Sequence, residues 1–432
     1  MPAIKRLGEA VSRSVLRVSA ILLVVGLISG PSTARADDIV LRWNEIAART
    51  GTATSPFNQA RIAAIVQLAV FEAVNAITGE YEPYLNPATV PAPGASVEAA
   101  VTMAAHTVMT TYFPAAALAL NTARDADLNA IPAGPAKTAG IAVGMAAANA
   151  MIALRAADGS APLLAIVPTS TAAGDYRLTT GCAAAMFYSW QHVTPFGIAN
   201  AADFLLAPPP SLTSNRYAKD YLETATVGAS TSTARPADRV DVVRLYAVSS
   251  PSFVLSMATR QIAAQKGTSV SDNARALALI NMAISDALVA SFFNKYQYNL
   301  WRPETAIRNG AVDGNGKTEG DVGFATFIPT PCFPSYPSNH ASGTNGGLEV
   351  MRRLFGAAGH NITITNNVPP LGALPAKAIT ESYTQLKQIA DDVDDARVYG
   401  GIHFRFDQDA GGVLGRAIAT EVVKNNLRPV HP

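Results

Sequence analysis

The chain has 432 residues, of which 49% are hydrophobic, and 33 basic residues nearly balance 32 acidic ones. This balance excludes a global electrostatic field that would draw nucleic acid or an anionic membrane surface to the protein. The length and hydrophobic content allow one large core or two closely packed lobes. Alanine is abundant and runs of β-branched residues are short, which favours helices over sheets. We therefore expect a mainly α fold.

The first 36 residues differ from the rest of the chain. A basic stretch precedes an apolar run at 18–30, and Ala34-Arg35-Ala36 before Asp37 has the small-x-small form of a cleavage site. The pattern predicts a signal peptide over 1–36 and an exported protein, periplasmic or secreted. A membrane anchor is the alternative, but roughly 13 apolar residues fall short of the roughly 20 that span a bilayer. We find no later segment that is long and apolar enough, so no membrane partner is expected after cleavage.

The remaining sequence predicts one helical domain over 37–432. Apolar residues between Ile62 and Ile77 recur at helical spacing, and similar patterns cover 97–112 and 134–156. Prolines and glycines then interrupt the pattern before a second helical set begins. The domain is expected to have an N-terminal helical lobe at 37–157, a loop-rich connector at 158–237 and a second lobe at 238–432.

A helix is predicted over 272–302, with Pro303 ending it. Its apolar stripe consists of Leu277, Ile280, Ile284 and Leu288. Successive steps of two turns bring Lys295 and then Arg302 onto that stripe. Buried cations are costly unless they meet an anion, yet no acidic residue stands one turn away from them on this stripe. A solvated helix end is the alternative, and the shared face favours a ligand as the missing partner.

A second motif, Pro337-Ser338-Asn339-His340, precedes a predicted helix that runs to Phe355. Ser338 is a plausible N-cap. A helix N-terminus offers free N–H groups and the positive end of the dipole, which together favour an anion. The side chain of His340 should lie on the buried face of this helix. The alternative role for His340 is core packing.

The third motif follows Arg397, where Gly400-Gly401 precedes His403 and Asp407. We expect His403 and Asp407 on one helical face, one turn apart. Asp407 can then accept the N–H of one ring nitrogen and leave the other nitrogen facing a substrate or metal centre. The alternative is a local hydrogen bond that only orders the helix.

The three motifs, Lys295-x6-Arg302-Pro303, Pro337-Ser338-Asn339-His340 and Arg397-x5-His403-x3-Asp407, occur in this order. Together they resemble the signature of the vanadium-dependent haloperoxidases and the related type 2 phosphatidic acid phosphatase superfamily. Phe333-Pro334-x-Tyr336 and His403-Phe404-Arg405-Phe406-Asp407 are similar to the haloperoxidase branch. The resemblance covers roughly 270–425, and it implies helical bundles with the active site at the core of the C-terminal bundle.

Two positions depart from the family pattern. Asn339 stands where the family commonly has glycine, and its backbone N–H can still serve if its dihedral angles do not need glycine. Ala396 replaces a serine ahead of Arg397, which removes one hydroxyl and is expected to have a modest effect.

The resemblance implies a role for each motif residue. Vanadate would be bound by Lys295, Arg302, Ser338, Asn339, Arg397 and His403. His403 would be the axial ligand of vanadium, His340 the acid/base for protons of hydroxide and peroxide, and Lys295 a donor that polarises peroxide. Asp407 would support His403, and Phe333 would line the halide approach or serve only in packing.

The function implied is oxidation of halide by hydrogen peroxide to hypohalous acid, which then halogenates a small organic acceptor. Phosphate fits the same site, so the nearest alternative is a phosphatase that forms a phosphohistidine at His403 and protonates the leaving alcohol from His340. A non-catalytic phosphate-binding protein is the third alternative. The sequence leaves open the halide, the oligomeric state (a homodimer included) and whether Cys182 and Cys332 form a disulfide.

Overall fold

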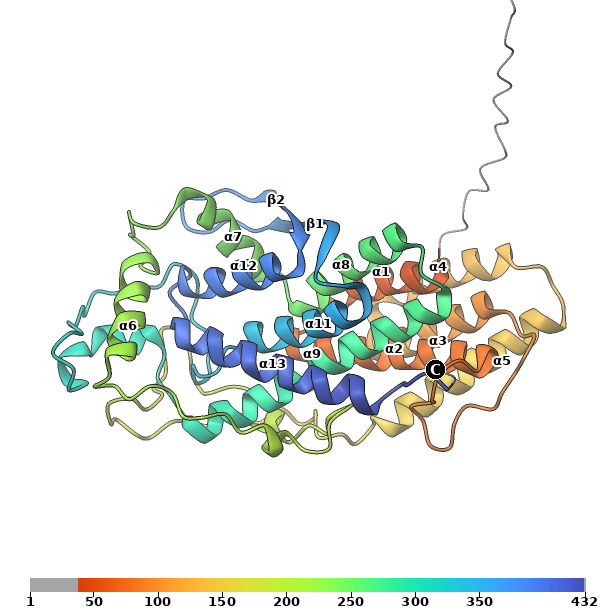
Figure 1. Cartoon of the computed structure of the whole chain (residues 1–432), viewed down its shortest axis with the longest axis horizontal. Coiled ribbons are helices and arrows are strands. Elements are labelled where there is room, and N and C mark those ends of the chain that lie inside the picture. The colour runs from red at the N-terminus through yellow and green to blue at the C-terminus, as the bar shows by residue number, and fades with distance from the viewer. Residues whose placement is uncertain (1–37, 431–432) are drawn as a thin grey trace, which may run out of the picture. The chain divides into compact units, whose positions relative to one another are not determined.

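The longest described helix, α9 (Val270–Tyr298), runs through the centre of the fold (Figure 1). The computed structural model describes residues 38–430. Ser269 caps the start of α9, where its Oγ accepts a hydrogen bond from the Asp272 backbone at 3.0 Å. Side chains around the whole circumference between Ala274 and Lys295 are mostly buried, as expected of a helix that neighbours enclose on all sides.

Two helices pack against the C-terminal half of α9 and against each other: α11 (Asn339–Phe355) and α13 (Arg405–Asn425). Glycines allow these helices to approach closely. A Cβ at Gly415 would lie 2.2 Å from the Ser342 carbonyl oxygen, and one at Gly346 would lie 3.0 Å from the Ala283 carbonyl oxygen. This close packing brings the N-termini of α11 and α13 to the same end of the bundle as Lys295.

The N-terminal helices form a second bundle around the other half of α9. The sequence periodicity correctly predicts α2 (Pro56–Thr78), α3 (Val97–Tyr112) and α5 (Pro135–Leu154), and α2 packs directly on α9. The remaining helices on this side are α1 (Ile39–Gly51), α4 (Ala117–Ala130), the 3₁₀ turn η1 (Pro114–Ala116) and α8 (Pro251–Lys266). The predicted mainly helical class is confirmed.

Residues 158–237 contain long loops with few helices. One disulfide, Cys182–Cys332, joins this stretch to the second motif region, with its Cα atoms 5.5 Å apart. The elements here and in the adjoining segments are η2 (Tyr188–His192), η3 (Ala201–Phe204), α6 (Asn215–Val227), α7 (Ala237–Val248), α10 (Pro303–Arg308) and η4 (Gly310–Val312).

A β-hairpin inside the second helical lobe was not expected from the sequence. Strand β1 (Ala358–Val368) pairs antiparallel with β2 (Lys377–Gln385), and α12 (Leu386–Val398) follows directly. The alternation of buried Ile362 and Ile364 with more exposed threonines is the period-two signal that indicates a strand with one buried face.

Three described helices reach the length and hydropathy of a membrane span, so the expectation that no later segment does was wrong. They are α2, α5 and α9, with mean hydropathies of 1.6, 1.4 and 1.8. Alanine-rich core helices attain the same hydropathy as a span. The most apolar windows of α2 and α9 are 83% and 94% buried inside the protein, whereas that of α5 is 33% buried.

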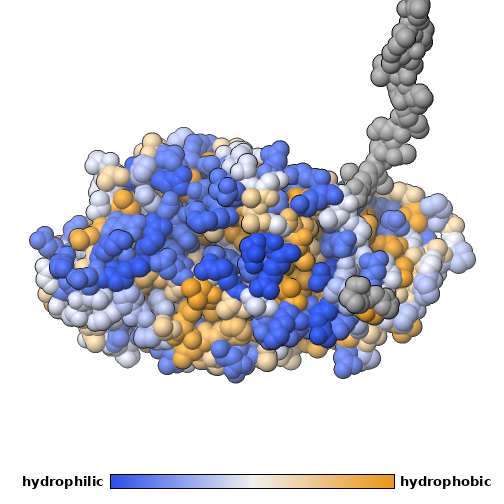
Figure 2. Space-filling view, in the orientation of Figure 1, coloured by the Kyte–Doolittle hydropathy of each residue, from blue (hydrophilic) through white to orange (hydrophobic). Residues whose placement is uncertain are grey.

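The domain boundaries stay a prediction. Residues 37–432 group into one compact unit, and the predicted signal peptide at 1–36 lies outside the described residues. Figure 2 shows hydrophilic residues covering much of one face of the protein, with hydrophobic patches between them.

Gly415→Ala should destabilise the contact between α11 and α13, because its Cβ would meet backbone atoms of Ser342 at 2.2 Å and of Gly346 at 2.6 Å. We expect the free energy of unfolding to fall by about 1–3 kcal/mol, as for other overpacked core positions. Gly412→Ala is the matched control on α13, since the nearest atoms there belong to the flexible Arg416 side chain. Urea unfolding measures both, and equal midpoints for the two variants would contradict the close packing.

Candidate active site

Lys295 lies on the last turn of α9 and is fully buried. Its Nζ donates to three backbone carbonyls, those of Pro334 at 3.0 Å, Ser335 at 2.7 Å and Pro337 at 2.5 Å. The ammonium group therefore holds the segment that leads into the second motif. Burial, followed by the charge of nearby Arg302, lowers the pKa of Lys295 well below its usual range.

Arg302 lies beyond the end of α9, so the prediction that this helix continues to residue 302 was wrong. Asn299 adopts a left-handed conformation with φ 48° and ends the helix, and the backbones of residues 299–301 pair instead with Gly174 and Tyr176. Arg302 becomes the N-cap of α10, which begins at Pro303. Its side chain nevertheless turns into the same buried space as Lys295.

The Arg302 guanidinium is fully buried and contacts the third motif directly. Nη1 lies 2.9 Å from His403 Nε2 and donates to the Ile402 carbonyl at 2.8 Å, while Nε donates to the Phe333 carbonyl at 2.7 Å. Nη2 is buried and has no hydrogen-bond partner. Burial lowers the pKa of Arg302 to about 10, so it remains a cation at neutral pH.

Arg397 comes from the last turn of α12 and lines the same space. Its Nη1 lies 3.3 Å from the Tyr246 carbonyl, and its buried Nε has no partner. Burial, and then the charge of Arg302, lowers the pKa of Arg397 to about 9. Gly401, with φ +80°, turns the chain sharply between Arg397 and His403 and so brings both side chains to one place.

The N-terminus of α11 faces these cations. The predicted N-cap is confirmed, since Ser338 Oγ accepts from the Ala341 backbone at 3.3 Å. Asn339 is the first helical residue, and its φ is not positive, so this position does not need glycine. Its Oδ1 accepts from Ser291 Oγ at 2.6 Å, while its buried Nδ2 has no partner.

His340 and His403 both face the centre of the site. His403 precedes α13 rather than lying on it, which corrects the prediction of a shared helical face with Asp407. The bond forms all the same, because Phe404 is the N-cap and Asp407 the third helical residue. His403 Nδ1 lies 2.8 Å from Asp407 Oδ2.

Asp407 has further partners that fix its position. Its Oδ2 accepts from Ser335 Oγ at 2.6 Å and from the Phe404 backbone at 3.1 Å. Burial raises the pKa of Asp407 to about 6. Ser335 was not among the predicted site residues, although its position between Pro334 and Pro337, directly before the second motif, was a usable signal.

Burial and the neighbouring cations hold the pKa values of His340 and His403 well below their usual range. Both rings are therefore neutral at pH 7. Because Asp407 accepts the Nδ1 proton of His403, the lone pair of that ring is on Nε2, which faces Arg302.

Phe333 separates the cations from an aromatic cluster. Its ring centroid lies 5.4 Å from Lys295 Nζ and 4.9 Å from the centre of the Arg302 guanidinium, within cation–π distance. The same ring packs edge-on against Phe57 and Phe292. Phe333 therefore has a packing role and also borders the site.

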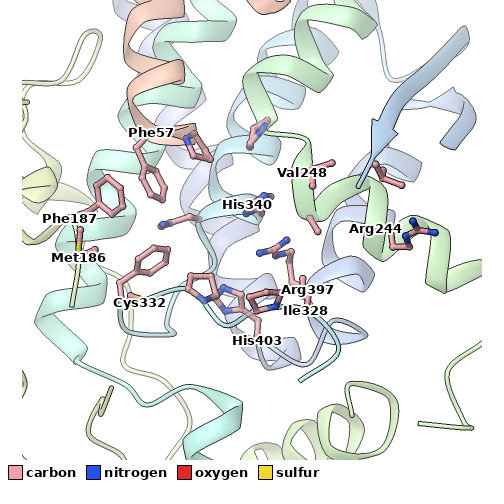
Figure 3. Close-up of a pocket in the computed structure, with 18 of the residues that line it drawn as sticks. Phe57, Met186, Phe187, Arg244, Val248, Ile328, Cys332, His340, Arg397 and His403 are labelled. Carbon is pink, nitrogen blue, oxygen red and sulfur yellow. The ribbon is translucent and has the colours of Figure 1, made fainter. Parts of the chain in front are cut away.

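A cavity of about 600 Å³ opens onto the site. Figure 3 shows His340 and Arg397 directed into the same space, with His403 beside them and Phe57 and Phe187 on one flank. Among the predicted site residues, those that line the cavity are Phe333, Asn339, His340, Arg397 and His403. Lys295, Arg302, Ser338 and Asp407 lie behind this wall, fully buried.

The C-terminal part of the chain matches a known family. Residues 275–432 match the model described as the VCPO second helical-bundle domain. A stretch of 94 residues is 32% identical to the vanadium chloroperoxidase of Curvularia inaequalis. That stretch covers 19% of this chain and spans only 15% of the length of the relative.

Solved structures resemble nearly the whole chain. A bacterial vanadium-dependent iodoperoxidase matches with a TM-score of 0.72 and 21% identity over 91% of this chain and 97% of its own. The holo form of a bacterial vanadium-dependent chloroperoxidase matches with a TM-score of 0.69 and 16% identity over 86% and 92% of the two chains. The resemblance carried by the three motifs is thus confirmed: residues 275–432 match the VCPO second helical-bundle domain, and the chain has the fold of the vanadium-dependent haloperoxidases.

Proposed function

We propose that this protein is a vanadate-dependent haloperoxidase that oxidises halide with hydrogen peroxide to hypohalous acid. The observation that carries the proposal is a buried group of three cations without an acidic partner. Within residues 38–430, no salt bridge involves Lys295, Arg302 or Arg397. Because a buried charge is costly unless it is paired, these cations favour the binding of an anion.

The residues fit a tetrahedral oxyanion such as vanadate. Arg302 Nη2, Arg397 Nε and Asn339 Nδ2 are buried donors that lack a partner. The Ser338 hydroxyl uses its oxygen as the helix cap, which leaves its proton free to donate. The N-terminus of α11 adds backbone N–H groups and the positive end of its dipole.

His403 would hold the oxyanion through Nε2, because this nitrogen carries a lone pair directed at the cationic group. Asp407 holds the opposite nitrogen in its protonated form and so keeps this tautomer. In the present arrangement Arg302 Nη1 occupies the space next to Nε2. Arg302 would hold the same oxyanion through Nη2, which has no other partner.

His340 is suited to accept a proton from hydrogen peroxide. Its ring is neutral at pH 7 and lines the cavity through which peroxide and halide would arrive. Bound vanadate would supply a Lewis-acidic centre that activates peroxide toward halide without changing its oxidation state. The three cations would offset the charge that develops during this step.

The phosphatase alternative would use the same residues. The vanadium chloroperoxidase and the solved structures named above are haloperoxidases, which does not favour the phosphatase. The activity assay below separates the two functions.

We also propose that the protein is exported. The Cys182–Cys332 disulfide supports this proposal, because disulfides persist mainly in oxidising compartments. The signal peptide itself rests on the sequence alone.

Arg302→Met should abolish oxyanion binding. Without an anion this variant should be at least as stable as the wild type, since it removes a buried charge that lacks a counter-ion. Orthovanadate or phosphate should raise the unfolding temperature of the wild-type protein but not that of the variant, as measured by calorimetry. Arg416→Met, at an exposed position of α13, is the control and should keep the shift. An equal shift in Arg302→Met would exclude this residue from the site.

His403→Ala should abolish bromination of a small β-diketone by protein supplied with orthovanadate, peroxide and bromide. His340→Ala should lower the rate about 10²- to 10⁴-fold, the usual contribution of an acid/base group, and still bind vanadate. His192→Ala, at an exposed position away from the cavity, is the control. Hydrolysis of a phosphate monoester without any halogenation would replace the proposed function with the phosphatase.

Ala36→Arg should block signal cleavage, because the −1 position of such a site requires a small residue. The mass of the exported wild-type protein should correspond to a chain that begins at Asp37, and Ala36→Ser should match it. Recovery of the wild-type chain only in the cytoplasm, with its first 36 residues retained, would refute export.

A further inference from the structure

The cavity beside the cationic site is far larger than peroxide and halide require. Its volume is about 600 Å³, whereas one water molecule takes up about 30 Å³ in the liquid. Pockets that bind small organic molecules measure about 300–1,000 Å³. The space can therefore hold an organic molecule next to His340 and Arg397.

The wall of this cavity is apolar on the side away from the site. Phe57 and Phe187 form one flank, their ring centroids 4.7 Å apart and their planes at 70°. Leu288 of α9 and Ile328 extend this wall, and both are almost fully buried. Exposed apolar residues at the opening are Pro56, Met186, Val248 and Pro329. Polar groups lie at the end where the histidines are, and Arg244 is a further charged residue of the lining on another side of the cavity (Figure 3).

Phe187 is held in this wall at a conformational cost. Its φ is 61°, in the left-handed region that bulky side chains rarely adopt. Such strain persists where the surrounding structure enforces it, and it clusters at binding sites. Two links hold the segment of Phe187 against the segment of Phe333: the Cys182–Cys332 disulfide, and a hydrogen bond from the Met186 backbone to the Cys332 carbonyl at 2.7 Å.

We propose that this cavity is the binding site of the organic acceptor, and that the acceptor is an electron-rich aromatic compound without a positive charge. Aromatic rings pack well against the edges and faces of Phe57 and Phe187. The cations at the end of the cavity disfavour a cationic ligand. The inference rests on the proposed haloperoxidase function and names the substrate class of that site.

The chemistry balances with the reagents of the proposed function. Peroxide, halide and a proton give hypohalous acid and water. An aromatic carbon of the bound acceptor then attacks the halogen, so that a carbon–halogen bond forms and the halogen–oxygen bond breaks. The ring proton and the released hydroxide leave as water. The halogen is reduced and the ring oxidised, and the transfer occurs before hypohalous acid escapes through the cavity.

The first test is binding of 1-naphthol by calorimetry, with neither peroxide nor halide present. We expect saturable binding to the wild-type protein and an affinity about tenfold lower in Phe187→Ala, which removes one ring of the wall. Met186→Ser, at the exposed opening, is a second variant with little risk to folding and should also weaken binding. Val322→Ala, at an exposed position away from the cavity, is the matched control and should bind as the wild type does.

The second test is the product ratio, because 1-naphthol has two reactive ring positions. The wild-type enzyme should halogenate these two positions in a ratio that differs from the ratio given by free hypohalous acid added without enzyme. In Phe187→Ala the ratio should shift toward that of free hypohalous acid. Val322→Ala, which lies away from the cavity, is again the control and should keep both the wild-type product ratio and the wild-type rate of diketone bromination.

The outcomes distinguish this inference from the proposed function. An enzyme that brominates the diketone but shows no saturable 1-naphthol binding would overturn the acceptor site alone. The same holds if Phe187→Ala binds 1-naphthol as tightly as the wild type does. Absence of all halogenation would instead overturn the proposed function, and the acceptor role with it.

Discussion

Burial of three cations in one place is the constraint on which the rest of the site depends. Each cation is removed from water, and backbone carbonyls replace only part of its solvation. Lys295 uses all three of its donors on the segment 334–337, whereas Arg302 and Arg397 each keep a buried donor without a partner. An anion of the right geometry would complete the remaining hydrogen bonds and offset the charge.

The helix bundle provides the rigidity that such a site needs. Glycines on α11 and α13 let these helices pack in near backbone contact, so the helix ends that carry Ser338 and Asp407 are fixed relative to each other. A direct bond joins them, because the Ser338 backbone N–H donates to the Asp407 carbonyl at 2.9 Å. The buried carboxylate then fixes the His403 tautomer, and loss of close packing would disturb the orientation of His403 Nε2.

The cavity combines two environments within one wall. Phe333 contacts the cations with its ring and the aromatic cluster with its edge, so the polar and apolar parts are directly adjacent. An apolar molecule in the cavity can therefore lie directly beside the charged residues. The left-handed conformation of Phe187 shows that this apolar wall is maintained against a conformational cost.

Local rules in the sequence were enough for α2, α3, α5, α11 and the body of α9, for the Ser338 cap and for the three motifs, because periodicity and capping depend on neighbouring residues. Helical phase alone also grouped Lys295 with Arg302 and His403 with Asp407, although neither pair lies on one helix. The tertiary structure decided those positions, since the left-handed Asn299 ends α9 and the chain re-enters the site from a loop. It also decided the hairpin, the Cys182–Cys332 pairing and the contact with Ser335, which depend on packing between segments distant in the sequence.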